Sequence, residues 1–181
     1  MKKIIVGALV GGLIIFAWQS VSYTVLGIHR SAEKYTPQQD SILNYLGTHL
    51  VTSGNYSLPN YPDNATMDQQ NDLMKNMQGK PWATILYHHS YNGNMTKSMI
   101  HCYLIDLLIV GFLCWVLMKM NAPSFGTVFL SCVAVGLIVF LDSPLTAHVW
   151  YMTYGIKADL IDAVASFGIT GLWLGWWLRR K

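Results

Sequence analysis

Six ionisable side chains lie inside or beside long apolar segments, and they are the residues of this sequence most able to do chemistry. They are His101, Asp106, Asp142, His148, Asp159 and Asp162. Burying such groups in lipid is costly, so intramembrane acids and histidines are candidates for functional roles. If the apolar segments are helices, these residues lie at a similar depth near one membrane surface. The sequence therefore predicts a polar pocket at that depth.

Two helical faces would line this pocket. Ser98, Cys102 and Asp106 follow one another at intervals of one helical turn, so they share a face, with His101 beside them. In the last apolar segment, a narrow polar stripe at helical spacing contains Asp159, Asp162, Ala163, Ser166 and Thr170. If these two faces lie opposite each other, the polar insert at 29–98 would sit directly over the polar pocket.

Three interpretations of the Asp/His group remain open. The carboxylates could handle protons or cations, as intramembrane acids often do. His101 and His148 could ligate a metal or haem, because imidazole is the commonest metal-binding side chain. The aspartates near a helix N-terminus could instead only complement the helix dipole. His88 and His89 are adjacent on a predicted strand, so their rings point to opposite faces, and we predict neither a metal nor a cofactor.

No motif for catalysis accompanies these residues. The sequence has no nucleophile elbow, and no Ser or Cys is linked by a motif to a His and an acid. It also lacks a phosphate-binding loop and a dinucleotide fingerprint. An enzymatic activity is therefore the least supported class of function, and the chain gives no catalytic residue.

Four apolar runs must position the polar residues: 4–28, 99–118, 125–141 and 158–178. Each is near the ~20 residues that cross a bilayer as a helix, which predicts a four-span integral membrane protein. Basic residues follow Met1 and end the chain, and Lys119 follows the second run. By the positive-inside rule, both termini and the 119–124 turn face the cytoplasm.

The first run also resembles a signal peptide, since Lys2 and Lys3 precede it and Ser20-Val21-Ser22 could be a cleavage site. The run is longer than a typical signal-peptide core, which favours an uncleaved helix that serves as both targeting signal and anchor.

The polar insert at 29–98 is predicted to be a small α/β module on the periplasmic side. Thr36–Gln39 and Thr66–Gln69 both have the sequence of a capping box, and each would open a helix. The first helix would end at Gly54, an extended segment would follow at 55–59, and 82–87 has the composition of a strand. A module this short can bury only a small hydrophobic core of its own. We therefore expect it to pack against the membrane helices or against a partner.

Small residues predict close helix packing. Gly7 and Gly11 form one GxxxG pair, Gly171 and Gly175 form another, and Gly168 lies on the same face as the second pair. Packing within the chain is the simpler interpretation, and a partner subunit on one face is the alternative.

Composition supports a membrane class and excludes others. Hydrophobic residues form 52% of the chain and charged residues only 12%, and a net charge of +3 is too small for a nucleic-acid surface. The three cysteines all fall in predicted spans, so no disulfide framework is expected in the insert. The lipid bilayer and other membrane protein subunits are the expected partners.

The whole pattern resembles a family of uncharacterised bacterial four-span inner-membrane proteins of about this length. The resemblance is carried by the start of the chain through Gly12, by Phe16-Ala17-Trp18 and Ser22, by Leu86-Tyr87-His88, by Trp150-Tyr151, by Leu160-Ile161-Asp162 and by Gly171-Leu172-Trp173-Leu174. It implies a bacterial inner (cytoplasmic) membrane location and one intact domain, and it transfers no catalytic residues.

These observations predict an all-helical membrane domain of four transmembrane helices, with the α/β insert between the first and second. The leading functional hypothesis is a non-catalytic accessory or interaction subunit of an inner-membrane assembly, whose insert contacts partners. The alternative is a membrane protein that binds a small ligand, lipid or cofactor in the Asp/His pocket of the outer leaflet.

Overall fold

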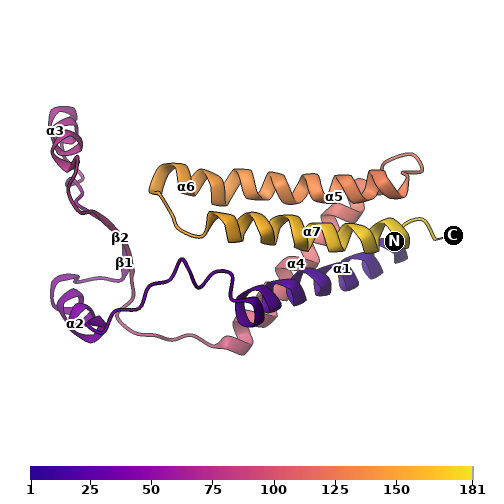
Figure 1. Cartoon of the computed structure of the whole chain (residues 1–181), viewed down its shortest axis with the longest axis horizontal. Helices are drawn as coiled ribbons and strands as arrows, with labels where there is room; N and C mark the ends of the chain where they lie inside the picture. Colours follow the sequence, from indigo (N-terminus) through magenta and orange to yellow (C-terminus); the bar gives the residue numbers. More distant parts are fainter. Residues whose placement is uncertain (181) are drawn as a thin grey trace. The chain divides into compact units, whose positions relative to one another are not determined.

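A computed structural model describes residues 1–180 and contains four helices long and apolar enough to cross a membrane. Their number matches the four apolar helices that the sequence predicts. The first span is α1 (Lys2–Ser20) with a π-helical continuation, η1 (Val21–Leu26), and the second is α4 (Met95–Leu117). The third begins as α5 (Phe125–Phe140), and the fourth is α7 (Ile156–Trp177). Together with their flanking residues these helices form one compact unit (Figure 1).

The third span is longer than the apolar run at 125–141 predicts. After α5 the helix continues through a π-helical turn, η2 (Leu141–Leu145), into α6 (Thr146–Tyr151). Pro144 has no N–H to donate, so the α-helical hydrogen-bonding pattern cannot continue through it unchanged. The helix does not end there but widens into a π-helical turn. The Thr146 hydroxyl donates to the Leu141 carbonyl at 2.9 Å, which helps to satisfy the widened turn. Asp142 therefore lies within a helix and not in a connection.

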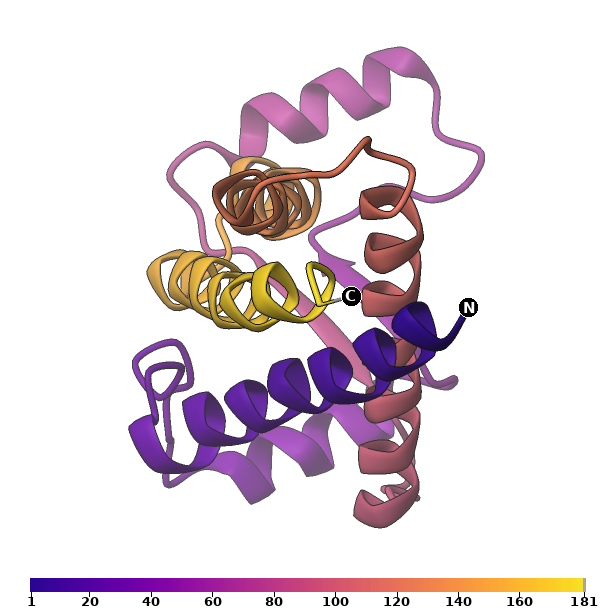
Figure 2. The same cartoon turned by 90° about the vertical axis from the view of Figure 1, so that its right-hand side faces the viewer.

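Helix α7 is the centre of the membrane unit. It packs against α5 on one side and α1 on the other, and α1 also packs against α4 (Figure 2). The buried core contains Cys114 from α4, Cys132 from α5 and Leu174 from α7, each with no exposed surface. The two cysteines thus serve as small apolar side chains in helix packing.

Glycines set the close approach of these helices. A Cβ atom on Gly12 would lie 3.0 Å from the backbone nitrogen of Leu107, and one on Gly136 would lie 2.6 Å from the carbonyl oxygen of Ala163. Glycine is therefore required where α1 meets α4 and where α5 meets α7.

Residues 36–93 form a second compact unit, which contains α2 (Gln39–His49), β1 (Gly54–Leu58), α3 (Met67–Met77) and β2 (Ala83–Tyr87). The strands pair antiparallel, from Gly54 opposite Tyr87 to Leu58 opposite Ala83. The predicted order of helix, strand, helix and strand is confirmed. Helix α2 is shorter than predicted, since it ends at His49 and Gly54 begins a strand.

The two capping-box sequences behave differently. At α3, the Thr66 hydroxyl accepts from the Gln69 backbone at 3.4 Å, and the Gln69 side chain accepts from the Thr66 backbone at 2.9 Å. This box is confirmed. The box predicted at Thr36 is wrong, because α2 begins only at Gln39, so Thr36 is not the N-cap and Gln39 is not the third residue of the helix. The Thr36 hydroxyl instead accepts from the Gln38 backbone at 3.3 Å.

This second unit has almost no interior. Within residues 36–93, Tyr87 is the one buried residue, with 7% of its surface exposed. Apolar side chains remain half exposed or more on its helices and strands, among them Leu43, Tyr45, Met74 and Leu86. Burial of apolar surface is the main stabilising term of folding, so the unit gains little of it alone.

Candidate functional site: a carboxylate-lined cleft in the membrane unit

A cleft of about 740 Å³ lies among the membrane helices. Its walls come from α1 and η1, from the first half of α4, from the α5–η2 junction and from the first half of α7. Most of the lining is aliphatic or aromatic, and Phe16, Phe140 and Phe167 are among these residues. Three carboxylates also line it: Asp106, Asp159 and Asp162. Among the described residues that line it, none is Lys or Arg.

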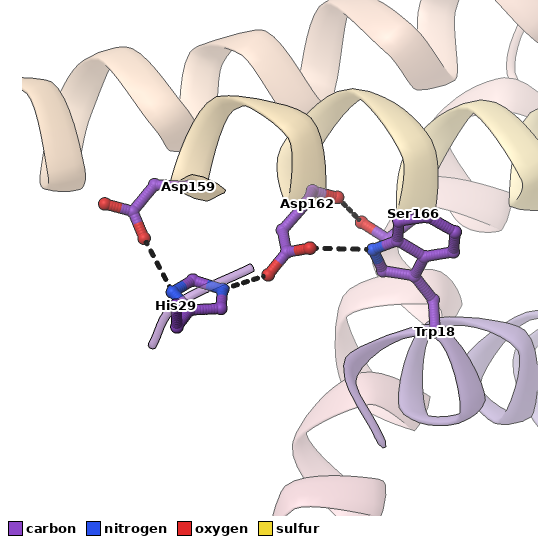
Figure 3. Close-up of polar contacts among 5 residues, drawn as sticks. All are labelled: Trp18, His29, Asp159, Asp162 and Ser166. Carbon is purple, nitrogen blue, oxygen red and sulfur yellow. Dashed lines mark hydrogen bonds and ion pairs between the residues drawn. The ribbon is translucent and has the colours of Figure 1, made fainter. Parts of the chain in front are cut away.

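Asp162 is the best-bonded of the three acids (Figure 3). Its Oδ1 accepts the indole N–H of Trp18 at 2.9 Å, and its Oδ2 lies 2.7 Å from Nε2 of His29. One turn later, the Ser166 hydroxyl donates to the Asp162 backbone carbonyl at 2.6 Å. Both carboxylate oxygens therefore have a donor, which offsets much of the cost of placing this charge in a membrane.

His29 connects the end of the first span to α7. Its Nε2 faces Asp162, and its Nδ1 lies 4.0 Å from Oδ1 of Asp159 (Figure 3). The ring stacks on Tyr23 with centroids 4.1 Å apart and planes 5° apart. A protonated ring would pair with both carboxylates, whereas a neutral ring would donate one N–H to Asp162 alone.

The local backbone explains how His29 reaches α7. Gly27 ends η1 in the left-handed conformation, at φ 56°, where a glycine carries no steric penalty. Two tight turns follow, with the Arg30 amide donating to the Gly27 carbonyl and the Ala32 amide to the His29 carbonyl. The chain therefore turns back at the helix end.

Asp106 is the most deeply buried acid of the cleft. It is 2% exposed, and its Oδ1 accepts one long hydrogen bond of 3.4 Å from Gln19. Its Oδ2 is buried and has no hydrogen-bond partner among residues 1–180. A buried polar atom without a partner costs about 1–3 kcal/mol, and more when it is charged. Such an atom in the wall of a cleft indicates that a donor from outside the chain completes the site.

The polar stripe of α7 faces α1 and the cleft, and it stops inside the membrane unit. Ser166 and Thr170 are buried, and a Cβ on Gly11 of α1 would lie 3.3 Å from the methyl carbon of Thr170. The next turn presents Leu174, which has no exposed surface and belongs to the apolar core. Among the described residues the polar stripe of α7 therefore ends at Thr170, where the apolar core begins.

The structure brings together only part of the predicted pocket. Asp106, Asp159 and Asp162 line the same cleft, and α1 packs against both α4 and α7 there. His101 and Asp142 are exposed and do not line it. His148 lines a separate pocket of about 350 Å³, where its Nδ1 lies 2.7 Å from the Thr153 carbonyl oxygen.

Metal binding has no set of ligands in this arrangement. His101 and His148 do not share a cavity, and no group of three or more His, Cys, Asp or Glu side chains within residues 1–180 could hold a metal ion. The cleft also contains Ser98 and the free thiol of Cys102, but no base in the described part of the chain is hydrogen-bonded to either. The arrangement can hold a cation or a proton.

Four residues of this site were not among the sequence candidates: Trp18, Gln19, Tyr23 and His29. A signal for two of them existed, because Trp18 and Gln19 are hydrogen-bonding side chains inside an apolar run. His29 fell at the start of the predicted insert, where a histidine is unremarkable.

Four of the five predicted packing glycines are used within the chain. A Cβ on Gly7 would lie 2.6 Å from the Cys114 sulfur, and one on Gly11 would lie 2.7 Å from a Val110 methyl. Gly171 and Gly175 approach α5 at 2.8 Å by the same measure. Gly168 differs, since its nearest neighbour would be 4.0 Å away, and Gly12 and Gly136 are further close contacts that the motif did not indicate.

Comparisons of this chain with models of protein families, with curated proteins and with solved structures found no match.

Proposed function

We propose that this protein binds an amphipathic, lipid-like ligand in the carboxylate-lined cleft of its membrane unit. One observation carries the proposal: a 740 Å³ cleft combines apolar walls with a buried carboxylate oxygen that lacks a donor. Ligand sites are typically apolar concavities of ~300–1,000 Å³ with a few placed polar groups. An amphipathic molecule would supply both the apolar surface and the missing donor.

The orientation we propose places the cleft in the outer leaflet of a bacterial inner membrane, with both termini cytoplasmic. Two contacts between the N-terminal and C-terminal segments support placing both termini on the same side of the membrane. The Lys3 ammonium donates to the Leu178 carbonyl at 3.1 Å, and the Trp177 indole donates to the Lys3 carbonyl at 3.0 Å. The basic residues at this end and at Lys119 then obey the positive-inside rule. The insert would face the periplasm.

Purification from native membranes in mild detergent tests the binding function. Mass spectrometry should find a co-purified amphiphile with the wild-type protein. Ala163→Trp, which places a large side chain in the cleft, should remove it. Val164→Trp is the matched control, because Val164 is 39% exposed and does not line the cleft. Equal co-purification with all three proteins would contradict the proposal.

A second candidate function is an accessory or interaction subunit that contacts other proteins through its insert. The near absence of buried residues in 36–93 favours it, since exposed apolar surface on a folded unit often marks a protein interface. This function predicts that gentle extraction yields a larger assembly, which Leu86→Asp should dissociate without changing the cleft. Recovery of only a stable monomer would count against it.

A further inference from the structure

We propose that the ligand of the cleft carries a primary ammonium group, which donates to the free Oδ2 of Asp106. This inference rests on the proposed binding function and names the chemical class of the ligand.

The charge of the cleft favours a cation. Three carboxylates line it, and within the described chain the lining has no Lys or Arg. His29 can neutralise at most one of the three acids, so the cleft stays negative whether its imidazole is protonated or neutral. In a low-dielectric setting such a site attracts a positive group and repels an anion.

Hydrogen bonds and burial together identify Oδ2 of Asp106 as the contact atom, since the Asp159 side chain is 30% exposed. Asp162 already accepts from Trp18 and lies against His29, so its oxygens are occupied. Only 2% of the surface of Asp106 is exposed, and its Oδ2 has no hydrogen-bond partner among residues 1–180. This oxygen therefore needs an N–H or O–H from a bound molecule.

A primary ammonium fits this requirement better than the other cations. A quaternary ammonium has no N–H and would leave Oδ2 unpaired. A metal ion needs several converging ligands, and no such group of three occurs among residues 1–180. A primary ammonium has N–H donors, one of which would pair with Oδ2 of Asp106. The apolar part of the ligand would lie against Ile109, Val139 and Phe167.

Cys102 provides a native reporter for the test. Its thiol is exposed and lines the cleft, whereas Cys114 and Cys132 are buried. The full-length protein is placed in phosphatidylcholine nanodiscs, whose headgroup has no N–H, and a thiol-reactive maleimide is added. A fatty amine, the fatty alcohol and the fatty acid of the same chain length are then titrated as protecting ligands. Cys102→Ser confirms the labelled site.

The fatty amine is expected to protect Cys102 at a concentration roughly tenfold or more below that of the alcohol, because hydrogen bonds between charged groups are stronger. Asp106→Asn should bring the amine to the level of the alcohol. Asp142→Asn is the matched control, since Asp142 is exposed and lies outside the cleft. It should change the protecting concentration of neither the amine nor the alcohol.

Equal protection by amine and alcohol, unchanged by Asp106→Asn, would overturn the ammonium assignment and leave the binding function standing. Absence of protection by all three amphiphiles, with no change in labelling by Ala163→Trp, would overturn both. A further arm replaces part of the phosphatidylcholine with phosphatidylethanolamine. Protection by this lipid supports the proposal and identifies a lipid headgroup as the source. Protection by the fatty amine alone supports it and identifies a free amine.

Discussion

The Nε2 atom of His29 lies 2.7 Å from Oδ2 of Asp162, although the two residues are 133 positions apart in the chain. His29 follows the first span and Asp162 belongs to the last, so this pair joins the two ends of the membrane unit in sequence. With 13% and 19% of their side-chain surfaces exposed, both groups are mostly withdrawn from solvent. The pair also fixes the carboxylate that forms one wall of the cleft.

A double-mutant cycle should measure this pair as strongly coupled. His29→Ala and Asp162→Asn should each destabilise the protein, and their coupling energy should be about 1.5 kcal/mol or more, because the bond is short and its acceptor is charged. Thermal unfolding in detergent checks the prediction. The same cycle with His29→Ala and Asp142→Asn should be additive, and a coupling of equal size there would show that the first one is not specific to the pair.

The glycine contacts predict opposite results at two positions of one helix. Gly171→Ala should destabilise the protein by about 1–3 kcal/mol, since its Cβ would lie 2.8 Å from Cys132 Cβ and 3.2 Å from the Phe129 carbonyl. Gly168→Ala should be neutral or slightly stabilising, because its nearest neighbour would be 4.0 Å away and alanine is the better helix former. Unfolding titrations in mixed detergent micelles compare them, and equal losses would refute the assigned contact.

The insert offers a matched pair of threonines. Thr66→Ala should cost α3 about 1 kcal/mol, because its hydroxyl caps the helix. Thr36→Ala should have little effect, since Thr36 caps no helix. Hydrogen exchange of the α3 and α2 backbone amides reports each helix separately. Faster exchange in α2 after Thr36→Ala would mean that the first box does form.

This pair of threonines also shows where sequence patterns reach their limit. Both segments have the residue types of a capping box. The reciprocal bonds, however, require the threonine at the N-cap and the glutamine at the third residue of the helix. Helix α2 begins at the glutamine itself, so the geometry is lost. The capping-box sequence thus predicts that a helix forms, but it does not determine at which residue the helix begins.

In the membrane unit, too, local features could be predicted from the sequence and contacts between distant residues could not. The apolar runs and the spacing of Asp159 and Asp162 are local features, so four spans and a polar face of α7 could be predicted. His29 could not, because its role depends on a turn at Gly27 and a contact with the far end of the chain. The continuation of α5 past Pro144 could not be predicted either, since proline usually ends a helix and here is accommodated by a π-helical turn.

The proposed orientation can be checked with two lysines. In a variant whose native cysteines are replaced, Lys80→Cys in the insert should react with a membrane-impermeant maleimide on intact spheroplasts. Lys119→Cys, in the α4–α5 turn, should react only after permeabilisation. Both positions are exposed, so a difference in reaction reports the side of the membrane and not burial. The reverse pattern would place the insert and the cleft at the cytoplasmic side.

The central claim is that an amphiphile occupies the cleft, and photo-cross-linking tests it most directly. A fatty amine with a diazirine in its chain is activated in the presence of the membrane-embedded protein, and labelled positions are mapped by mass spectrometry. The account predicts labels on cleft residues such as Phe16, Ile109 and Phe140, and their loss in Ala163→Trp. Labels found only on the exposed apolar surface of α4, at residues such as Leu104 and Phe112, and unchanged by that variant, would contradict it.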